Sequence, residues 1–224
     1  MRVLGIETSS RRGSIALFES GSPVVTLCHE ELNAHAERLL PLIERALEQA
    51  GWNRAAIGRV AVGVGPGSFT GLRVGIALGQ GIAVGLGVEL VGIGSLRAMA
   101  AAVPESRAGT RWALLDARRG ELFAAAYDAA GNELCGPRAV EPAALGALID
   151  AVSPPREPRL LPRILVGEVI EALAVEGAES FRSPETDLPH AALVARLGAN
   201  AAPPAAGVEP LYVRDAGATL PKVG

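Results

Sequence analysis

The stretch Ile6-Glu7-Thr8-Ser9-Ser10-Arg11-Arg12-Gly13 decides the fold, because the chain repeats its pattern as Leu115-Asp116-Ala117-Arg118-Arg119-Gly120 about 108 positions later. In each copy an apolar run ends in an acidic residue, and Arg-Arg-Gly turns the chain toward a second apolar run. Each copy also opens the same predicted order of elements, which is strand, strand, strand, helix, strand. Self-similarity of this extent indicates an internal duplication.

The elements around the two copies follow from hydrophobic spacing and from turn residues. Apolar residues at helical spacing predict a first helix that Asn33 caps and Gly51 ends. The predicted strands cover residues 3–8, 14–18, 24–28, 59–65, 88–93, 112–116, 121–127, 133–135 and 163–166. The predicted helices cover residues 34–49, 70–86, 95–102 (with Ser95 as its cap), 142–152, 168–175 and 189–202.

This order of elements predicts an α/β fold with two ribonuclease-H-like lobes, each a mixed sheet flanked by helices. The two lobes are expected to face each other across a cleft. Residues 103–109 contain the breaker Pro104 and few apolar residues, which is typical of a boundary. We therefore expect an N-terminal lobe over residues 1–104 and a smaller, degenerate C-terminal lobe over residues 105–224.

Composition narrows the classes of function. The chain has 224 residues, 49% hydrophobic and 20% charged, which is enough to bury a core without disulfides or a structural metal. Its 21 basic and 24 acidic residues leave a formal charge of −3, which argues against autonomous binding to a nucleic-acid backbone. Lys222 is the only lysine, so neither a Schiff-base lysine nor a Walker phosphate loop is expected.

Cysteine usage and apolar run lengths indicate the compartment. Cys28 and Cys135 belong to no Cys-x-x-Cys pair, which is typical of the reducing cytoplasm. The first apolar residues are too few for a signal peptide. The uncharged run from Val74 to Val88 has 15 residues and includes Gln80, whereas a membrane span needs about 20 apolar residues. We expect a cytoplasmic protein without membrane contact.

Polar residues at the repeated turns resemble the remains of a nucleotide site. Glu7-Thr8-Ser9 follows the first strand, where a carboxylate can hold hydrated magnesium and hydroxyl groups can hold a phosphate. Ser68 before the second helix and Asp116 at the second turn complete the set. Glutamate is one methylene longer than the aspartate expected there, and Arg118 and Arg119 would crowd a phosphate beside Asp116. A polar turn without a ligand is therefore the favoured interpretation.

Gly71, Gly75 and Gly79 place a stripe of glycine on one face of the second helix. Each interior glycine costs about 1 kcal/mol of helix propensity relative to alanine, so close packing must offset the loss. The stripe could face the protein's own sheet or a helix of another polypeptide, and its spacing does not choose between them. Because the helix is apolar on nearly all sides, two buried faces are expected, which favours an interface.

Residues for metal binding and for nucleophilic catalysis are scattered. His29, His35 and His190 form no ligand motif, and no nucleophile–base pair is recognisable in the sequence. We expect no metal site and no catalytic residue. His35 is interpreted as a surface residue at the start of a helix rather than as a catalytic base.

Several longer stretches resemble the TsaB (YeaZ) family of bacterial tRNA threonylcarbamoyladenosine biosynthesis proteins. That family is a noncatalytic relative of TsaD in the actin-like ATPase (ASKHA) superfamily. The resemblance extends over nearly the whole chain, and its central block is highly specific. The matching stretches are Leu4–Ser9, His35–Pro41, Val62–Gly75, Leu115–Arg118 and Pro210–Asp215.

The resemblance implies a noncatalytic scaffold subunit without a cofactor. In catalytic relatives a metal-binding histidine pair stands where Ser95 and Met99 align, and neither residue can replace histidine. The implied partners are the catalytic subunit TsaD, the ATPase TsaE and a second copy of the chain, with tRNA reached through the complex. The implied interface lies on the first two helices and comprises His35, Leu39, Leu42, Ile43, Ala46, Gly71, Leu72, Gly75, Gly79 and Ile82.

Two other hypotheses stay open. A free-standing nucleotide-dependent kinase or carbamoyltransferase of the same fold would use Glu7, Ser68 and Asp116. A peptidase is disfavoured because no nucleophile–base pair is recognisable. Arg118 and Arg119 could also give tRNA a weak direct contact.

Overall fold

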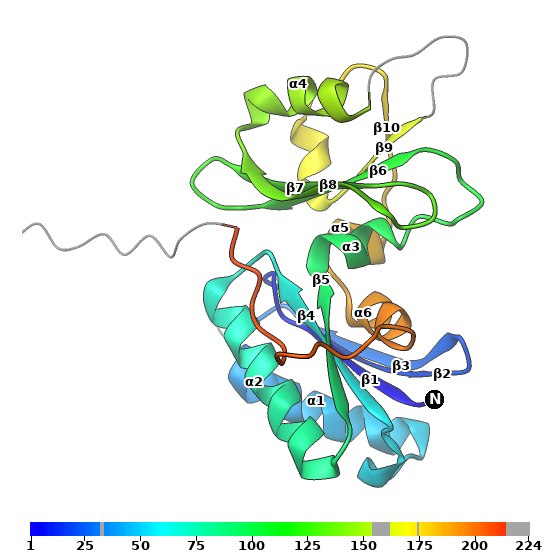
Figure 1. Cartoon of the computed structure of the whole chain (residues 1–224). Helices are drawn as coiled ribbons and strands as arrows, with labels where there is room; N and C mark the ends of the chain where they lie inside the picture. The colour runs from blue at the N-terminus through cyan, green and yellow to red at the C-terminus, as the bar shows by residue number, and fades with distance from the viewer. Residues whose placement is uncertain (32–33, 154–161, 174, 214–224) are drawn as a thin grey trace, which may run out of the picture.

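The computed structural model describes residues 1–31, 34–153, 162–173 and 175–213. Within them the chain forms two five-stranded sheets, one above the other in Figure 1. The first sheet contains β1 (Val3–Glu7), β2 (Gly13–Glu19), β3 (Ser22–His29), β4 (Arg59–Gly65) and β5 (Glu89–Gly94). The second contains β6 (Thr110–Asp116), β7 (Leu122–Tyr127), β8 (Glu133–Val140), β9 (Arg163–Val166) and β10 (Ala178–Ser180).

Both sheets have the same topology. The strand order is β3-β2-β1-β4-β5 in the first sheet and β10-β9-β6-β7-β8 in the second. In each, the central strand pairs antiparallel with the strand that follows it and parallel with the fourth strand of its half. The predicted α/β fold with two mixed-sheet lobes is therefore confirmed.

Helices cover both faces of each sheet (Figure 1). On the first sheet, α1 and α2 lie on one face and α6 on the other. The side chains of β1 point alternately to the two faces, so that Leu4 and Ile6 face α1 and α2 and Val3 packs with α6. On the second sheet, α4 and η2 cover one face, and α3 and α5 the other. The helices are α1 (His35–Ala50), η1 (Arg54–Ala56), α2 (Phe69–Leu86), α3 (Ser95–Ala100), α4 (Pro142–Val152), η2 (Glu168–Ala172), α5 (Pro184–Asp187) and α6 (Ala191–Gly198).

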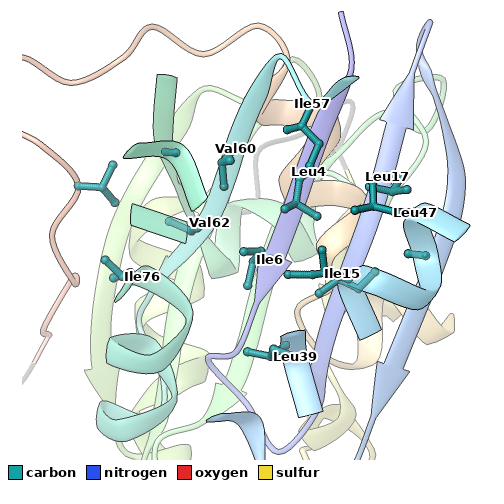
Figure 2. Close-up of a cluster of buried hydrophobic side chains, with 14 residues drawn as sticks. Leu4, Ile6, Ile15, Leu17, Leu39, Leu47, Ile57, Val60, Val62 and Ile76 are labelled. Atoms are coloured by element: carbon teal, nitrogen blue, oxygen red, sulfur yellow. The ribbon is translucent and has the colours of Figure 1, made fainter. Parts of the chain in front are cut away.

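The core beneath α1 and α2 is continuous across the first sheet (Figure 2). Side chains of β1 and β2 meet Leu39 and Leu47 of α1, and Val62 of β4 lies near Ile76 of α2. Alternating apolar residues along each strand supply this face, as expected for strands buried under helices. This core holds α2 against the sheet, and its first turn is joined to the end of β1 by the hydrogen bond from Thr8 to Gly71, where the candidate site lies.

Two helices pack on the sheet that is formed by the other half of the sequence. α3 follows β5 of the first sheet but packs on β6 and β7 of the second. α6 comes late in the chain yet packs on β1, β2 and β4. The segment after α6 stays with the first sheet, where the Leu211 amide donates to the Val64 carbonyl at 2.7 Å and Gln80 donates to the Val208 carbonyl.

Several local predictions differ from the structure. Ser95 is the first helical residue of α3 rather than its cap. Its hydroxyl donates a hydrogen bond to the Glu7 carboxylate of β1 instead of capping the helix. The helix predicted over 168–175 is the short 3₁₀ helix η2, and the one predicted over 189–202 is shortened to α6. β10 and α5 were not anticipated. The predicted cap Asn33 lies outside the described residues.

Candidate functional site

A cavity of about 530 Å³ lies between the two lobes. It is lined from one side by the turn after β1 and the start of α2, and from the other by the turn after β6. Of the five residues predicted for a nucleotide remnant, Ser9, Ser68 and Asp116 line this cavity. The repeated turns thus meet across the cleft, as the duplication predicts.

Glu7 turns away from that cavity. Its carboxylate is fully buried, accepting hydrogen bonds from the Ser9 amide at 2.7 Å and from the Ser95 hydroxyl at 2.9 Å. Burial raises the pKa of Glu7, and these hydrogen bonds only partly oppose the shift. Gly63 makes room for the carboxylate, since a Cβ there would collide with it. In this arrangement Glu7 links β1 to α3 and is not available to a ligand in the cleft.

Thr8 and Ser9 attach the end of β1 to the start of α2. The Thr8 hydroxyl donates to the Gly71 carbonyl at 2.8 Å, and the Ser9 carbonyl accepts from the Ser68 amide at 2.7 Å. The Ser68 hydroxyl accepts from the Gly71 amide at 3.2 Å and so caps α2. These hydroxyl groups support the fold, and of the three residues only Ser68 is exposed.

Asp116 is exposed at the opposite wall of the cavity. Its Oδ1 accepts the Arg118 amide at 2.8 Å, which closes the turn on itself. Arg118 and Arg119 both have left-handed backbone angles, with φ of 62° and 56°. Arg118 lines the cavity, so a bulky cation stands where a phosphate-binding turn would carry glycine.

Two further residues of the cleft were missed by sequence reasoning. Arg11 and Glu168 also line the cavity, and their side chains form an ion pair between the β1 turn and η2. Arg11 belongs to the repeated Arg-Arg-Gly turn, which was a signal for its position. Glu168 stands 157 residues away, and nothing in the sequence joins it to that turn.

His35 is buried rather than on the surface, which corrects the prediction. Its Nε2 lies 3.1 Å from the Ser10 carbonyl and its Nδ1 3.1 Å from Nε2 of His29. Because the carbonyl only accepts, His35 donates to it through Nε2. Burial and the neighbouring His35 lower the pKa of His29. The pair ties the start of α1 to β3 and the β1 turn.

The glycine stripe of α2 packs on the protein's own sheet, so its interpretation as the contact for a second polypeptide is wrong. A Cβ at Gly71 would collide with the Thr8 carbonyl, one at Gly75 with the Thr8 hydroxyl, and one at Gly79 with Val62. The other implied interface residues that the protein's own core buries are Leu39, Ile43, Ala46 and Leu72.

The other face of α2 is apolar and uncovered. Val84 is 83% exposed, and Leu40 on α1 is 49% exposed. Between these two helices and η1 lies a groove of about 360 Å³, whose lining includes Ile43, Ile82 and Leu86. By length and composition alone α2 could cross a membrane, but its glycine face is held against the sheet. We call this surface, formed by Leu40, Ile82, Val84, Gly85 and Leu86, the exposed α1–α2 face.

Metal ligands do not gather in the part of the chain that the structure describes. No group of three or more histidine, cysteine, aspartate or glutamate side chains is placed to hold an ion there. Ser95 and Met99 are both fully buried, the first bonded to Glu7 and the second in the core under the second sheet. Neither lines the cavity between the lobes.

Comparison with known proteins gives the chain its relatives. The family model for TsaD, tRNA N6-adenosine threonylcarbamoyltransferase, matches residues 30–202. The tRNA threonylcarbamoyladenosine biosynthesis protein TsaB of Escherichia coli is 38% identical over 130 residues, covering 57% of this chain and 55% of that protein. The chain thus spans about half the length of the curated relatives it matches.

Solved structures resemble the chain over nearly its full length. YeaZ from Pseudomonas aeruginosa has a TM-score of 0.71 and 27% identity, covering 94% of this chain and 99% of that one. An activator of 2-hydroxyisocaproyl-CoA dehydratase from Clostridium difficile has a TM-score of 0.57 at 11% identity, covering 88% and 94%. The second likeness concerns the fold alone, and it agrees with an architecture of two mixed-sheet lobes.

Proposed function

Because the chain belongs to the TsaD family and within it to the TsaB (YeaZ) group, we propose that it is a noncatalytic subunit in the biosynthesis of threonylcarbamoyladenosine in tRNA. In this role it binds and supports a catalytic TsaD subunit. The ATPase TsaE acts in the same complex, and tRNA is reached through the complex rather than by this chain alone. A second copy can occupy the same surface when TsaD is absent.

The exposed α1–α2 face is the observation that carries this proposal. Beyond the glycine face that meets the sheet, α2 exposes Val84, and Ile82, Gly85 and Leu86 line the groove toward α1, where Leu40 is also exposed. Apolar patches of this kind on folded proteins mark contact surfaces for other polypeptides. The groove beside it runs between two helices, a shape that suits a helix of the partner.

The chemistry of the cleft supports a noncatalytic role. Glu7, the counterpart of a magnesium-holding carboxylate, is bonded inside the fold to Ser95. Arg118 occupies the wall beside Asp116. The competing hypothesis, a nucleotide-dependent kinase or carbamoyltransferase, needs a carboxylate and magnesium at this cavity. We expect calorimetry to detect no magnesium-dependent ATP binding at micromolar concentrations, and such binding, lost in Asp116→Asn, would support the enzyme instead.

The docking surface is tested by one charge placed on it. Val84→Glu should weaken binding to TsaD from the same organism at least about tenfold, because a carboxylate must then be desolvated within an apolar contact. Val24→Glu is the matched control, since Val24 is an exposed valine (45%) on β3 and lies on neither α1 nor α2. Calorimetric titration measures both variants. Unchanged affinity for Val84→Glu, or equal losses in the two variants, would contradict the surface assigned to TsaD.

A further inference from the structure

A second cavity, of about 360 Å³, shares no lining residue with the cleft. It lies where α3 and the segment after it meet the C-terminal end of α6 and the turn between β7 and β8. The proposed docking function does not use this cavity, and its surroundings are rich in arginine.

Three arginines from three different elements line it: Arg97 of α3, Arg111 of β6 and Arg196 of α6. The guanidinium of Arg97 is exposed and makes no hydrogen bond or ion pair with any residue that the structure describes, while its backbone carbonyl accepts the Ala101 amide. Arg196 donates to the Ala101 carbonyl. Arg111 is 2% exposed and donates to the carbonyls of Asp128 and Pro104, while its Nε has no partner in the described residues.

Tyr127 adds a second unused donor. Its ring is 3% exposed at the end of β7 and lines the same cavity. Its hydroxyl forms no hydrogen bond with the residues described, and unlike Arg111 Nε it is not a fully buried atom, so it can reach a ligand in the cavity. Burial raises the pKa of Tyr127, so the hydroxyl stays protonated and able to donate at neutral pH.

The charges around the cavity favour an anion. Glu105 and Asp128 also line it and offset part of the positive charge. The Asp128 carboxylate already accepts two hydrogen bonds from Asn132, however, through the amide and the side chain. The Glu105 carboxylate opposes an anion, but the Arg97 and Arg196 guanidinium groups and the Tyr127 phenol supply more donors and more positive charge to the lining than Glu105 removes. A group with several acceptor oxygens and negative charge fits such donors best.

We propose that this cavity binds a phosphate group. Arginine matches phosphate oxygens through paired N–H donors, and three arginines from different elements can surround the group. The volume exceeds that of a phosphate, and Ile93 and Val103 give the remainder an apolar wall. The group can belong to a free phosphorylated small molecule or to the backbone of an RNA, and the test separates these sources.

The test is calorimetric titration of the full chain at constant ionic strength, held with chloride. The probes are inorganic phosphate, pyrophosphate and a twelve-nucleotide single-stranded RNA. We expect saturable binding of at least one probe, weakened about tenfold in Arg97→Gln and in Arg196→Gln, and several-fold in Tyr127→Phe. Glu105→Gln should instead bind several-fold more tightly, because it removes an opposing charge. Arg138→Gln, on exposed β8 and outside this cavity, should bind as the unmodified chain does.

Every outcome decides the proposal. If phosphate or pyrophosphate binds, and the variants change its affinity as expected, the ligand is a free phosphorylated molecule. If only the RNA binds, and the variants change its affinity in the same way, the ligand is a backbone phosphate. The proposal is overturned if none of the probes binds below about 10 mM, or if Arg97→Gln and Arg196→Gln bind no more weakly than Arg138→Gln. The melting temperature of each variant, measured without probe, separates a loss of binding from a loss of folding.

Discussion

Glu7 shows at the scale of one residue how an acidic side chain at the end of a strand can serve the fold. Its side chain stands at the end of the central strand β1. Here it is a buried carboxylate bonded to Ser9 and Ser95, with no ion pair among the described residues. The residue now links β1 to α3, so its effect should appear in stability rather than in turnover.

The pH dependence of stability tests this view of Glu7. Its pKa is raised above 4.5 in the folded chain, so between 4.5 and the folded pKa the native state holds a proton that the unfolded state has released. Stability therefore falls as pH rises through that window, and the full penalty is present above it. Glu7→Gln lacks the penalty, so its stability relative to the unmodified chain should increase from pH 4.5 to neutral pH.

Urea unfolding at a series of pH values measures that difference. Glu48→Gln, on the exposed side of α1, provides the control. A difference between Glu7→Gln and the unmodified chain that stays constant from pH 4.5 to 7 would mean that Glu7 does not titrate as a buried group.

Residue identities predicted part of this site and could not predict the rest. Glutamate in place of aspartate, and arginines beside Asp116, were sufficient to suggest a vestigial site. The direction in which Glu7 points depends on Gly63 and Ser95, which lie 56 and 88 positions away and give no local signal. The burial of His35 could not be predicted either, because it depends on contacts with His29 and Ser10 that only the folded chain brings together.

At the scale of the element, α2 has two apolar faces with different roles. Its glycine face lets the helix lie close to β1 and β4, and its other face carries Val84 into solvent. The sequence predicted that both faces would be buried but could not tell which one meets the sheet. Glycine and valine are equally compatible with either side, and only the approach of Thr8 and Val62 decides it.

Alanine placed at two glycines of α2 should therefore have opposite effects. A Cβ at Gly75 collides with the Thr8 hydroxyl, so Gly75→Ala should destabilise the fold by about 1–3 kcal/mol. At Gly81 a Cβ meets open space, and Gly81→Ala should stabilise it by about 0.5–1 kcal/mol through helix propensity. Urea midpoints compare the two, and stabilisation by both would mean that α2 does not lie so close to β1.

At the scale of the whole molecule, the two halves of the sequence are joined by an exchange of helices. The duplication predicted two similar sheets, and both are present. It did not predict that α3 packs on the second sheet or that α6 returns to the first, because these contacts join positions far apart in sequence. The division into lobes at residue 104 stays a proposal, and it separates α6 from the sheet that α6 covers.

A fragment of residues 1–104 should consequently fail to fold alone. Without α6 it exposes the apolar face of β1, β2 and β4, including Val3, Ala16 and Ala61. Circular dichroism and sedimentation should show an unfolded or aggregated chain. Co-expression with residues 105–224 should restore a soluble complex, because it supplies the missing layer. A soluble, cooperatively folding 1–104 monomer would contradict the packing described for α6.

The central claim is that the exposed α1–α2 face is where this chain meets its catalytic partner. Amide hydrogen exchange of the full chain, with and without TsaD, tests it most directly. The account predicts slower exchange in the complex at residues 40–47 and 77–86, with little change at β3 and α4. Protection confined to the cavity between the lobes, or an unchanged exchange rate over α1 and α2 in a complex that does form, would contradict it.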